Sequence, residues 1–354
     1  MENDFEKEML NKLQTLRTQK TVRILAIESS CDETSVAIVE NGRKVLSNIV
    51  SSQIEIHTRF GGVVPEIASR NHILAINPIL EEALEKANCT LDDIDAIAVT
   101  QGAGLVGALL VGVTSAKALS YATKKPLIAV NHIKGHIAAN FIAHKDLKPP
   151  FICLITSGGH TAIVKVLDYN KFSMIGTTQD DAIGEAFDKV ARIVGLGYPG
   201  GPKIDKMAKG EKGTIEFVKH DAFENSFDVS YSGLKTAVIN YVHTMEQRGE
   251  KLDIKNICAS FEHQAVEMLT KKAIKACLQE NIKTVVLAGG VAANSYLREN
   301  ITKLAKENGI EVLFPPIELC GDNAAMIGSL AYFNLLSDEP AKLDMTAKPN
   351  IPLE

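Results

Sequence analysis

The chain has 354 residues, of which 45% are hydrophobic and 23% charged, and its formal net charge is −5. This length exceeds what one hydrophobic core usually serves, so we expect two domains of ordinary size. The composition is typical of a soluble globular protein, and no apolar run reaches the roughly 18 residues of a membrane span. The acidic net charge argues against autonomous, indiscriminate nucleic-acid binding, but it allows a local basic groove or a basic partner.

The six cysteines are scattered and form no C-x-x-C pair. This pattern favours reduced thiols in a cytoplasmic protein over a disulfide framework or a zinc ribbon. Residues 1–20 are charged and lack the apolar block of a secretory signal, so we expect a polar helical extension or a frayed end there.

The first half of the chain alternates strands and helices. Apolar runs predict strands at 23–27, 36–40, 43–51, 94–100 and 126–130. Helical periodicity covers 66–88, 105–122 and 131–144. A proline-rich segment at 148–150 is the best candidate for a linker.

The second half begins with the same pattern of strand, polar turn and return strand, at 151–156, 157–161 and 162–166. A strand at 284–287, a helix at 294–308, a strand at 312–314 and a long apolar helix follow. This repetition predicts a duplicated α/β fold, in which ligands bind between the halves. We expect an extension at 1–20, a first domain at 21–148 completed by a helix at 322–337, a second domain at 149–321, and a loose tail at 338–354.

His132 and His136 lie four residues apart in the predicted helix at 131–144. This spacing places both imidazoles on one helix face, where they can share a divalent metal ion. The alternative is that they are two polar residues on a solvated helix face.

Asp322 follows a glycine and precedes the last apolar helix. It is either an ordinary N-cap or the carboxylate that completes a two-histidine, one-carboxylate metal site. Its distance from the histidines in sequence does not decide between these readings.

Three turns that follow predicted strands could expose backbone N–H groups to a phosphate: 29–32, 157–159 and 289–290. Glycine lets the backbone approach an anion closely, and a helix N-terminus favours negative charge. Tight turns also need glycine without binding anything, and no Walker or Rossmann glycine motif is present.

The segment 180–205 combines acidic residues, among them Asp188 and Asp205, with a glycine- and proline-rich tract. It is either a loop able to wrap a small polar ligand or a solvated acidic helix followed by a flexible loop.

Together these motifs resemble the bacterial TsaD family of tRNA threonylcarbamoyladenosine transferases, formerly described as glycoproteases. The resemblance runs from about residue 24 to 335 and is carried by nine motifs in order: 27–34, 61–70, 102–107, 131–136, 157–160, 180–189 with 198–201, 231–235, 289–294 and 321–325.

The resemblance implies a duplicated actin/Hsp70/sugar-kinase-like (ASKHA) fold. It implies that His132, His136 and Asp322 hold one divalent metal, with iron(II) expected first and zinc or magnesium as alternatives. His160 matches the bacterial branch, whereas archaeal and eukaryotic members carry a tyrosine ligand where Ile155 stands. We therefore expect water or substrate to fill the remaining coordination positions. The residues implied to contact the nucleotide-like substrate are Ile155, Thr156, Ser157, Gly158, Gly159, Asp188, Gly201, Asp205 and Asn294.

The implied reaction moves a threonylcarbamoyl group from threonylcarbamoyl-adenylate to N6 of the adenosine 3′ of the anticodon. The tRNAs concerned read codons that start with A, and AMP is released. Because the donor is an activated mixed anhydride, the protein mainly positions and polarises it. Asp188 and Asp205 are expected to hold ribose hydroxyls, and Asp32 or Glu33 to take the proton of the amine.

The implied partners are tRNA, a TsaB-like paralogue and a TsaE-like ATPase, with the adenylate supplied by a separate synthase. No membrane association is expected. Because the chain is acidic, we expect the isolated protein to bind tRNA only weakly.

Three other functions are weighed against this one. A zinc protease of the H-E-x-x-H type needs a glutamate after the first histidine, and Ile133 stands there. A small-molecule kinase or ATPase of the same fold would transfer phosphoryl groups to a small acceptor. A non-catalytic actin-like scaffold would bind nucleotide without turnover and would have no use for two histidines and an aspartate.

Overall fold

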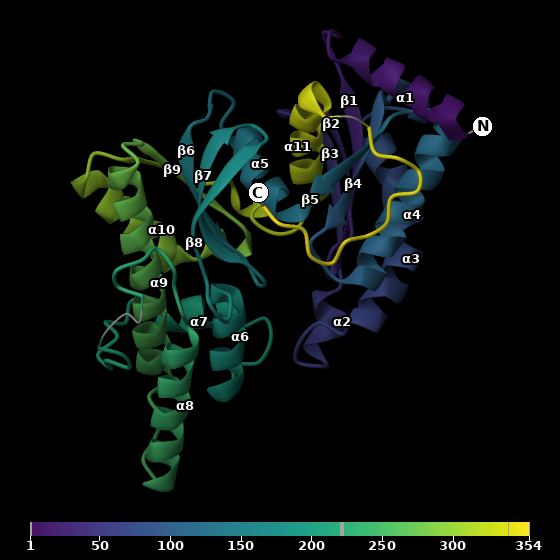
Figure 1. The fold of residues 1–354 in the computed structure, drawn as a ribbon. Helices are drawn as coiled ribbons and strands as arrows, with labels where there is room; N and C mark the ends of the chain where they lie inside the picture. Colours follow the sequence, from purple (N-terminus) through teal and green to yellow (C-terminus); the bar gives the residue numbers. More distant parts are fainter. Residues whose placement is uncertain (1, 220–222, 339, 354) are drawn as a thin grey trace. The chain divides into compact units, whose positions relative to one another are not determined.

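Two five-stranded sheets of the same topology organise the part of the chain that the computed structural model describes, residues 2–219, 223–338 and 340–353. The chain divides into two compact units (Figure 1). Unit 1 contains the described residues up to Lys148 and from Gly321 onward, and unit 2 spans Pro149–Cys320.

The sheet of unit 1 has the strand order β3-β2-β1-β4-β5. β1 pairs antiparallel with β2 and β2 with β3, whereas β1, β4 and β5 run parallel. The strands are β1 (Arg23–Glu28), β2 (Glu33–Glu40), β3 (Lys44–Ser52), β4 (Ala96–Gly102) and β5 (Leu127–Asn131).

The sheet of unit 2 repeats this plan, with the order β10-β9-β6-β7-β8. β6 and β7 form the antiparallel hairpin that β1 and β2 form in unit 1, and β9 and β10 are the added parallel strands. The predicted duplicated α/β fold is therefore confirmed. The strands are β6 (Phe151–Thr156), β7 (Thr161–Asp168), β8 (Lys171–Thr177), β9 (Thr284–Ala288) and β10 (Glu311–Leu313).

Helices cover both faces of the sheet in unit 1. Leu25 and Ile27 of β1 join a core shared with α3 and α4, while α11 packs against β1 and β2 on the other face. A strand buried on both faces needs a continuous apolar run, which is what residues 24–27 supply. The helices are α1 (Glu2–Leu16), α2 (Ile54–Thr58), α3 (Pro65–Lys86), α4 (Val106–Thr123), α5 (His132–Ala143) and α11 (Ala324–Ser337).

Among the described helices, α4 alone is long and apolar enough to cross a membrane by length and composition. Its residues Leu109, Val113 and Ala116 are buried in the core of unit 1, and the helix packs against β4 and α3. A core helix of a globular domain meets the same criterion, and this packing is that of a core helix.

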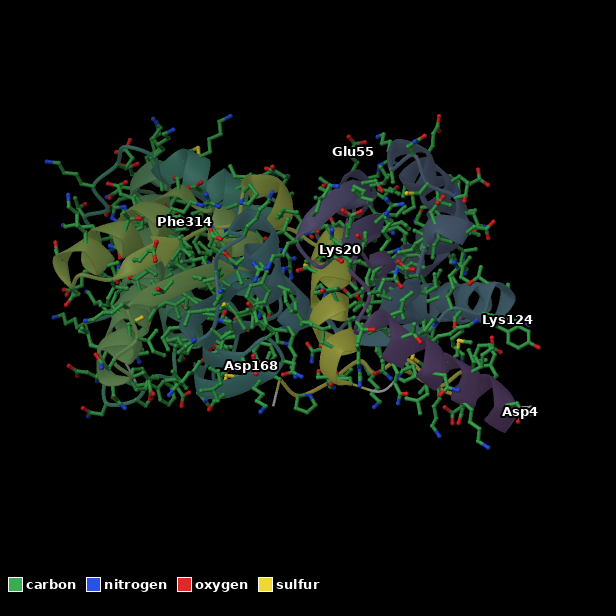
Figure 2. All side chains as sticks on the ribbon, turned by 90° about the horizontal axis from the view of Figure 1, so that it is seen from above. Asp4, Lys20, Glu55, Lys124, Asp168 and Phe314 are labelled. Atoms are coloured by element: carbon green, nitrogen blue, oxygen red, sulfur yellow. The ribbon has the colours of Figure 1, made fainter. Side chains whose placement is uncertain are left out.

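Both ends of the chain pack onto unit 1. Met9 and Leu13 of α1 are buried, and Lys12 Nζ donates a hydrogen bond to the carbonyl of Lys124, 2.7 Å away. Figure 2 labels Asp4, near the start of α1, and Lys124, which follows α4. The N-terminal extension is thus a docked helix.

The described residues of the C-terminal segment, 338 and 340–353, form no helix or strand, but they are not the loose tail expected from the sequence. The amides of Ala341 and Lys348 donate to the carbonyls of Leu127 in β5 and Gln101 in β4, at 2.7 and 2.8 Å. Ala347 is buried. The segment runs across unit 1 (yellow in Figure 1) because these backbone hydrogen bonds and apolar contacts hold it there.

In unit 2, the helices α6, α7, α8 and α9 form one core with β6. Phe187 of α6 and Phe261 of α9 meet edge to face at its centre, with ring centroids 5.1 Å apart. The helices are α6 (Ile183–Ile193), α7 (Gly200–Ala208), α8 (Ser232–Gln247), α9 (Ile254–Gln279) and α10 (Ser295–Glu307).

Gly328 sets how closely α11 approaches the sheet of unit 1. A Cβ atom at this position would lie 2.7 Å from Val39 Cγ2 and 3.3 Å from Ala26 Cβ. We expect Gly328→Ala to lower the free energy of unfolding, because overpacking costs about 1–3 kcal/mol against a helix-propensity gain of about 1 kcal/mol.

Urea unfolding measures this effect, and Gly233→Ala is the matched control. Gly233 also lies in a helix, but its added Cβ would meet nothing within 4 Å. An equal midpoint for Gly328→Ala and the wild type would show that α11 can move away from the sheet without cost.

Candidate functional site

His132 and His136 lie on α5, which begins directly after β5. Asn131 is the N-cap of this helix, and its side-chain oxygen accepts hydrogen bonds from the amides of Ile133 and Lys134 at 2.9 and 3.2 Å. The two imidazole rings lie one turn apart with centroids separated by 4.7 Å. His132 is 8% exposed and His136 1%, so the reading of a solvated helix face is wrong.

Asp322 reaches these histidines from the start of α11. Gly135 allows the close approach of α5 and α11, because a Cβ there would lie 2.8 Å from Ile327 Cδ1. The N-cap of α11 is Asn323, whose side chain accepts a hydrogen bond from the amide of Met326 at 3.1 Å. The prediction that Asp322 is an N-cap is therefore wrong, because Asn323 caps α11. The carboxylate of Asp322 instead contacts the two histidines.

One possible ligand atom from each of His132, His136 and Asp322 lies within 4.8 Å of the others. Asp322 Oδ1 is 3.1 Å from His136 Nε2 and 3.4 Å from His132 Nε2. Both ring nitrogens of His136 are buried without an aligned hydrogen-bond partner among the described residues. Two imidazoles and a carboxylate converging on one point, with an orphaned buried nitrogen, fit a divalent transition-metal ion.

Glu28 contacts His132 on the side of the ring away from Asp322 and orients it. The sequence did not predict this role. The Glu28 carboxylate is fully buried and accepts hydrogen bonds from the Ser30 amide at 2.5 Å and from Thr100 Oγ1 at 2.6 Å. His132 Nδ1 lies 3.0 Å from Glu28 Oε2. A proton on Nδ1 leaves the Nε2 lone pair of His132 directed toward Asp322 and the metal position.

In the metal-free protein, His132 and Asp322 each stabilise the charged form of the other. Burial lowers the pKa of His132, but the negative charges of Asp322 and Glu28 outweigh it and raise this pKa to about 9. Burial raises the pKa of Asp322, but the charge on His132 and the contact with His136 hold it at about 2. A metal ion therefore replaces a proton on His132, so binding should release protons.

Asp32 and Glu33, the candidate bases, lie in the turn between β1 and β2 and at the start of β2. Asp32 is 6% exposed, and its Oδ2 has no hydrogen-bond partner among the described residues. Burial, together with the charges of Asp322 and Asp32, raises the pKa of Glu33 to about 9. In the metal-free protein Glu33 is thus protonated near neutral pH.

The turn at 29–32 uses part of its hydrogen-bonding capacity within the protein. The amide of Ser30 donates to Glu28, and the hydroxyl of Ser29 donates to the carbonyl of Ala108 at 2.9 Å. The carboxylates of Glu28 and Asp32 in and beside the turn also disfavour an anion there.

The residues implied to contact substrate all lie in unit 2. Ile155 and Thr156 end β6 and are fully buried, while Gly158 and Gly159 are exposed. The amide of Ser157 donates to the carbonyl of His160 at 2.8 Å, so this N–H closes the turn and is not available to a ligand. Of the three residues of the expected cradle, only Gly158 and Gly159 remain as backbone donors to an anion.

Asp188 and Gly201 meet where α6 and α7 pack together. Asp188 Oδ1 accepts a hydrogen bond from the amide of Gly200 at 2.6 Å, at the first residue of α7. Burial raises the pKa of Asp188. One face of α6 is buried in the core of unit 2 through Ile183 and Phe187, whereas Glu185 on the same helix is exposed.

Asp205 and Asn294 meet at the start of α10. Asp205 accepts hydrogen bonds from the hydroxyl and amide of Ser295, the latter at 3.2 Å. Asn294 caps α10 by accepting from the amide of Leu297 at 2.8 Å. Its amide group donates to Glu262 Oε1 at 2.7 Å. Glu262, on α9 and 2% exposed, was also missed by the sequence reasoning, because a single glutamate in a long helix carries no signal.

Glu262 makes the stability of the protein depend on pH. Burial raises its pKa to about 7; the hydrogen bond from Asn294 opposes this and the charge of Asp205 adds to it. The folded protein therefore holds this proton in a pH range where the unfolded chain has lost it. The wild type should lose up to about 3 kcal/mol of stability between pH 4.5 and 8, relative to a residue that does not titrate.

Urea unfolding of the wild type and Glu262→Gln at pH 5 and pH 8 measures this loss. The wild type should lose stability relative to Glu262→Gln as pH rises, and the difference should level off above pH 8. Parallel pH profiles for the two proteins would show that Glu262 titrates normally.

The repeated α/β plan is found in several solved structures. Full-length HypF in its phosphate- and nucleotide-bound form matches 89% of this chain and 55% of its own, with a TM-score of 0.60 and 16% identity. Component A of the Acidaminococcus fermentans (R)-2-hydroxyglutaryl-CoA dehydratase matches 89% of this chain and 99% of its own, with a TM-score of 0.51 and 15% identity. At these identities the likeness shows the fold alone.

Fold and site together define a duplicated α/β protein of the actin/Hsp70/sugar-kinase type with a buried two-histidine, one-carboxylate centre. The model of the family TsaD, tRNA N6-adenosine threonylcarbamoyltransferase, matches residues 44–329. The transferase of that name from Clostridium perfringens (strain SM101) is 61% identical over 331 residues, 93% of this chain and 98% of its own. That of Clostridium botulinum (strain 657) is 57% identical over 336 residues, 95% and 99% of the two chains. The chain belongs to the TsaD family.

Proposed function

We propose that this protein transfers the threonylcarbamoyl group of threonylcarbamoyl-adenylate to N6 of the adenosine 3′ of the anticodon. The tRNAs are those that read codons starting with A, and AMP is released. The observation that carries the proposal is the convergence of His132, His136 and Asp322 in a chain that is 61% identical to a tRNA N6-adenosine threonylcarbamoyltransferase.

The three converging residues would hold one divalent metal, with Glu28 fixing the orientation of His132. We propose iron(II), because two imidazoles and one carboxylate suit iron better than the oxygen-rich sites of magnesium. Zinc is the nearest alternative. When bound, the ion supplies a Lewis acid that polarises an oxygen of the acyl-adenylate.

The other residues bind and orient the substrates. The backbone N–H groups of Gly158 and Gly159 are proposed to donate to donor oxygens, while Asp188 and Asp205 accept from ribose hydroxyls. Ile155 and Thr156 end β6 and Ser157 follows them, so these residues set where the turn begins, the backbone of Gly201 donates to Asp188, and Asn294 caps α10.

We propose that Asp32 takes a proton from the attacking amine. Its buried Oδ2 has no hydrogen-bond partner among the residues described, and it lies in the same unit as the metal ligands. The pKa of Glu33 is raised in the metal-free protein by burial and by the charges of Asp322 and Asp32, so Glu33 is the weaker candidate for this proton transfer.

The reaction takes place on tRNA and so would occur in the cytoplasm. We propose a TsaB-like paralogue and a TsaE-like ATPase as partners, and a separate synthase as the source of the adenylate. The net charge of −5 supports a need for partners, because an acidic protein alone binds tRNA, a polyanion, weakly.

AMP release tests the proposed function directly. The protein, with and without the two partners, is incubated with threonylcarbamoyl-adenylate and tRNA lacking the modification. AMP should form in proportion to the tRNA supplied and not with a tRNA whose target adenosine is replaced. AMP release that ignores the tRNA would indicate simple hydrolysis and contradict the proposal.

A further inference from the structure

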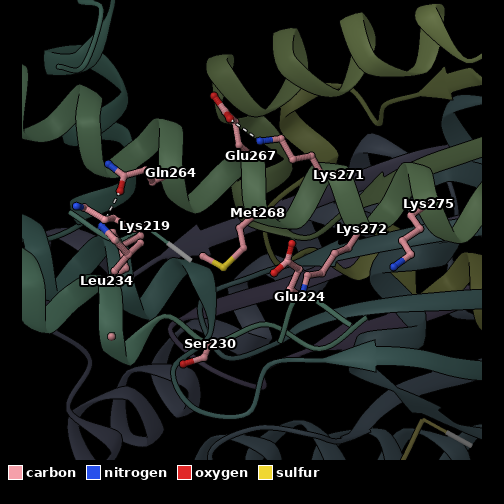
Figure 3. A pocket seen from close by; sticks show the side chains of 12 residues that line it. Lys219, Glu224, Ser230, Leu234, Gln264, Glu267, Met268, Lys271, Lys272 and Lys275 are labelled. Carbon is pink, nitrogen blue, oxygen red and sulfur yellow. Dashed lines mark hydrogen bonds and ion pairs between the residues drawn. The ribbon is translucent and has the colours of Figure 1, made fainter. Parts of the chain in front are cut away.

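A pocket of about 410 Å³ lies in unit 2, between α9 and the segment that leads into α8 (Figure 3). None of the nine residues implied to contact the donor lines it. Four lysines and two glutamates do, and we call it the lysine pocket, after Lys219, Lys271, Lys272 and Lys275.

One wall of the lysine pocket is a face of α9. Residues 264, 268 and 272 form one ridge of the helix, and residues 267, 271 and 275 form the neighbouring ridge, because positions four apart lie above one another. Lys271 and Lys275 are exposed at the outer ridge. Their ammonium groups can therefore meet a ligand that arrives from solvent.

Two polar side chains of α9 hold the opposite wall in place. Lys272, 6% exposed, donates hydrogen bonds from its Nζ to the carbonyls of Phe223, at 2.7 Å, and Asp228. Gln264 accepts from the amides of Phe217 and Val218 at 3.0 and 3.1 Å. These bonds fix the segment beside α9 without filling the space between them, so the pocket is a built feature of unit 2.

The charges in the pocket favour an anion. Its four lysines outnumber its two glutamates, and because Lys271 Nζ pairs with Glu267 at 2.9 Å, one glutamate remains against three lysines; the hydroxyl of Tyr296 also donates to Glu267, at 3.1 Å. Lys275 lies over the ring of Phe227, 5.7 Å from its centroid. Met268 and Leu234 add an apolar surface beside the lysines. A phosphate next to a flat apolar group, as in a nucleotide, matches this combination.

We propose that the lysine pocket binds one nucleotide of the tRNA outside the reacting position. Its backbone phosphate lies against Lys219, Lys271 and Lys275, and its base lies against Met268, because Leu234 is 1% exposed and belongs to the core of unit 2. This inference rests on the proposed function for the identity of the RNA. It assigns a second contact to the substrate, away from the transfer chemistry.

A strand of RNA fits the pocket better than a free nucleotide does. Exposed lysines contact backbone phosphates without reading the base, which is how proteins position a nucleic acid. A volume of about 410 Å³ exceeds what a bare phosphate needs, and three of the four lysines are exposed, so phosphates on either side of a bound nucleotide could also be contacted. The free nucleotide with the same chemistry is AMP, which the test separates from tRNA.

The test measures binding of labelled unmodified tRNA to the full-length protein by fluorescence anisotropy over a series of salt concentrations. Lys271→Gln/Lys275→Gln is compared with the wild type and with Lys303→Gln/Lys306→Gln, two exposed lysines of α10. We expect about 10-fold weaker tRNA binding at low salt and a salt dependence shallower by about 1.5 in log–log slope. The α10 control should match the wild type, and all three should share one thermal midpoint.

Equilibrium dialysis with AMP and a modification assay complete the test. AMP binding should be the same in all three proteins, and the pocket variant should show a raised KM for tRNA with kcat unchanged. Unchanged tRNA affinity in the pocket variant would overturn the inference, as would a selective loss of AMP binding. If the pocket variant loses tRNA affinity while the wild type makes no modified tRNA, the proposed function fails and the pocket contact stands.

Discussion

Replacing His136 by alanine is expected to remove the bound divalent metal and to lower the rate of threonylcarbamoyl transfer by more than about 100-fold. Losing a side chain that only orients a metal ligand already costs about 10–100-fold in affinity or activity, so losing a residue that binds the metal itself should cost more. His136 is 1% exposed, and its ring nitrogens have no aligned partner among the described residues. Without it, His132 and Asp322 offer two ligand atoms in place of three.

Metal content by elemental analysis and transfer rate are measured on the same preparation. His243→Ala is the control, because His243 lies exposed on α8 and forms only a surface pair with Glu246 at 3.4 Å. It should keep the full metal content and rate. A His136→Ala protein that retains both would show that the three residues do not form the metal centre.

Glu28→Gln is expected to lower metal affinity by about 10–100-fold although Glu28 is not itself one of the three proposed ligands. In the wild type, the carboxylate of Glu28 faces His132 Nδ1, Thr100 Oγ1 and the Ser30 amide. A glutamine must turn its NH2 group toward one side of this set. If the NH2 group faces His132, it donates to Nδ1, and the ring proton then moves to Nε2, where the proton blocks metal binding. If the NH2 group faces Ser30, two N–H donors meet without an acceptor.

Metal titration of the metal-free protein measures the loss, and transfer activity should recover at high metal concentration. This recovery separates weakened binding from misfolding, which excess metal would not repair. Glu55→Gln, an exposed change on α2, is the matched control. A titration of Glu28→Gln that overlays the wild type would mean that Glu28 serves only the packing of β1.

Much of the fold could be predicted from the sequence because its signals are local. Strand and helix periodicity and the repeat of strand, turn and return strand gave the duplicated α/β plan. The docking of the C-terminal segment could not be predicted, since it depends on backbone hydrogen bonds such as that from Lys348 to Gln101, which are independent of side-chain pattern. A segment without apolar periodicity carries no sign of such bonds.

The candidate site was predictable only in part. The four-residue spacing of His132 and His136 indicated a shared face, but for Asp322 the sequence left an N-cap and a metal ligand as alternatives, and only the family resemblance favoured the ligand. Local sequence favoured an N-cap role for Asp322, and the structure gives that role to Asn323. Glu28 carried one signal that was available: it is a charged residue at the end of an apolar strand buried on both faces, where charge is tolerated only with partners.

The phosphate-binding prediction shows the limit of reading turns by residue type. Ser157 stands in a turn rich in glycine, yet its amide is used by His160, and the turn at 29–32 faces carboxylates. Which N–H groups remain free depends on how each turn closes its own hydrogen bonds. That closure involves residues on both sides of the turn and is not visible from the glycines.

Mass analysis of tRNA nucleosides tests the central claim most directly. Unmodified tRNA that reads codons starting with A is incubated with threonylcarbamoyl-adenylate, the metal-loaded protein and its two partners, and then digested to nucleosides. We predict an adenosine carrying the mass of one threonylcarbamoyl group, located 3′ of the anticodon, with His136→Ala reduced to background. Absence of this nucleoside with the wild type, or an equal yield with His136→Ala, would contradict the account.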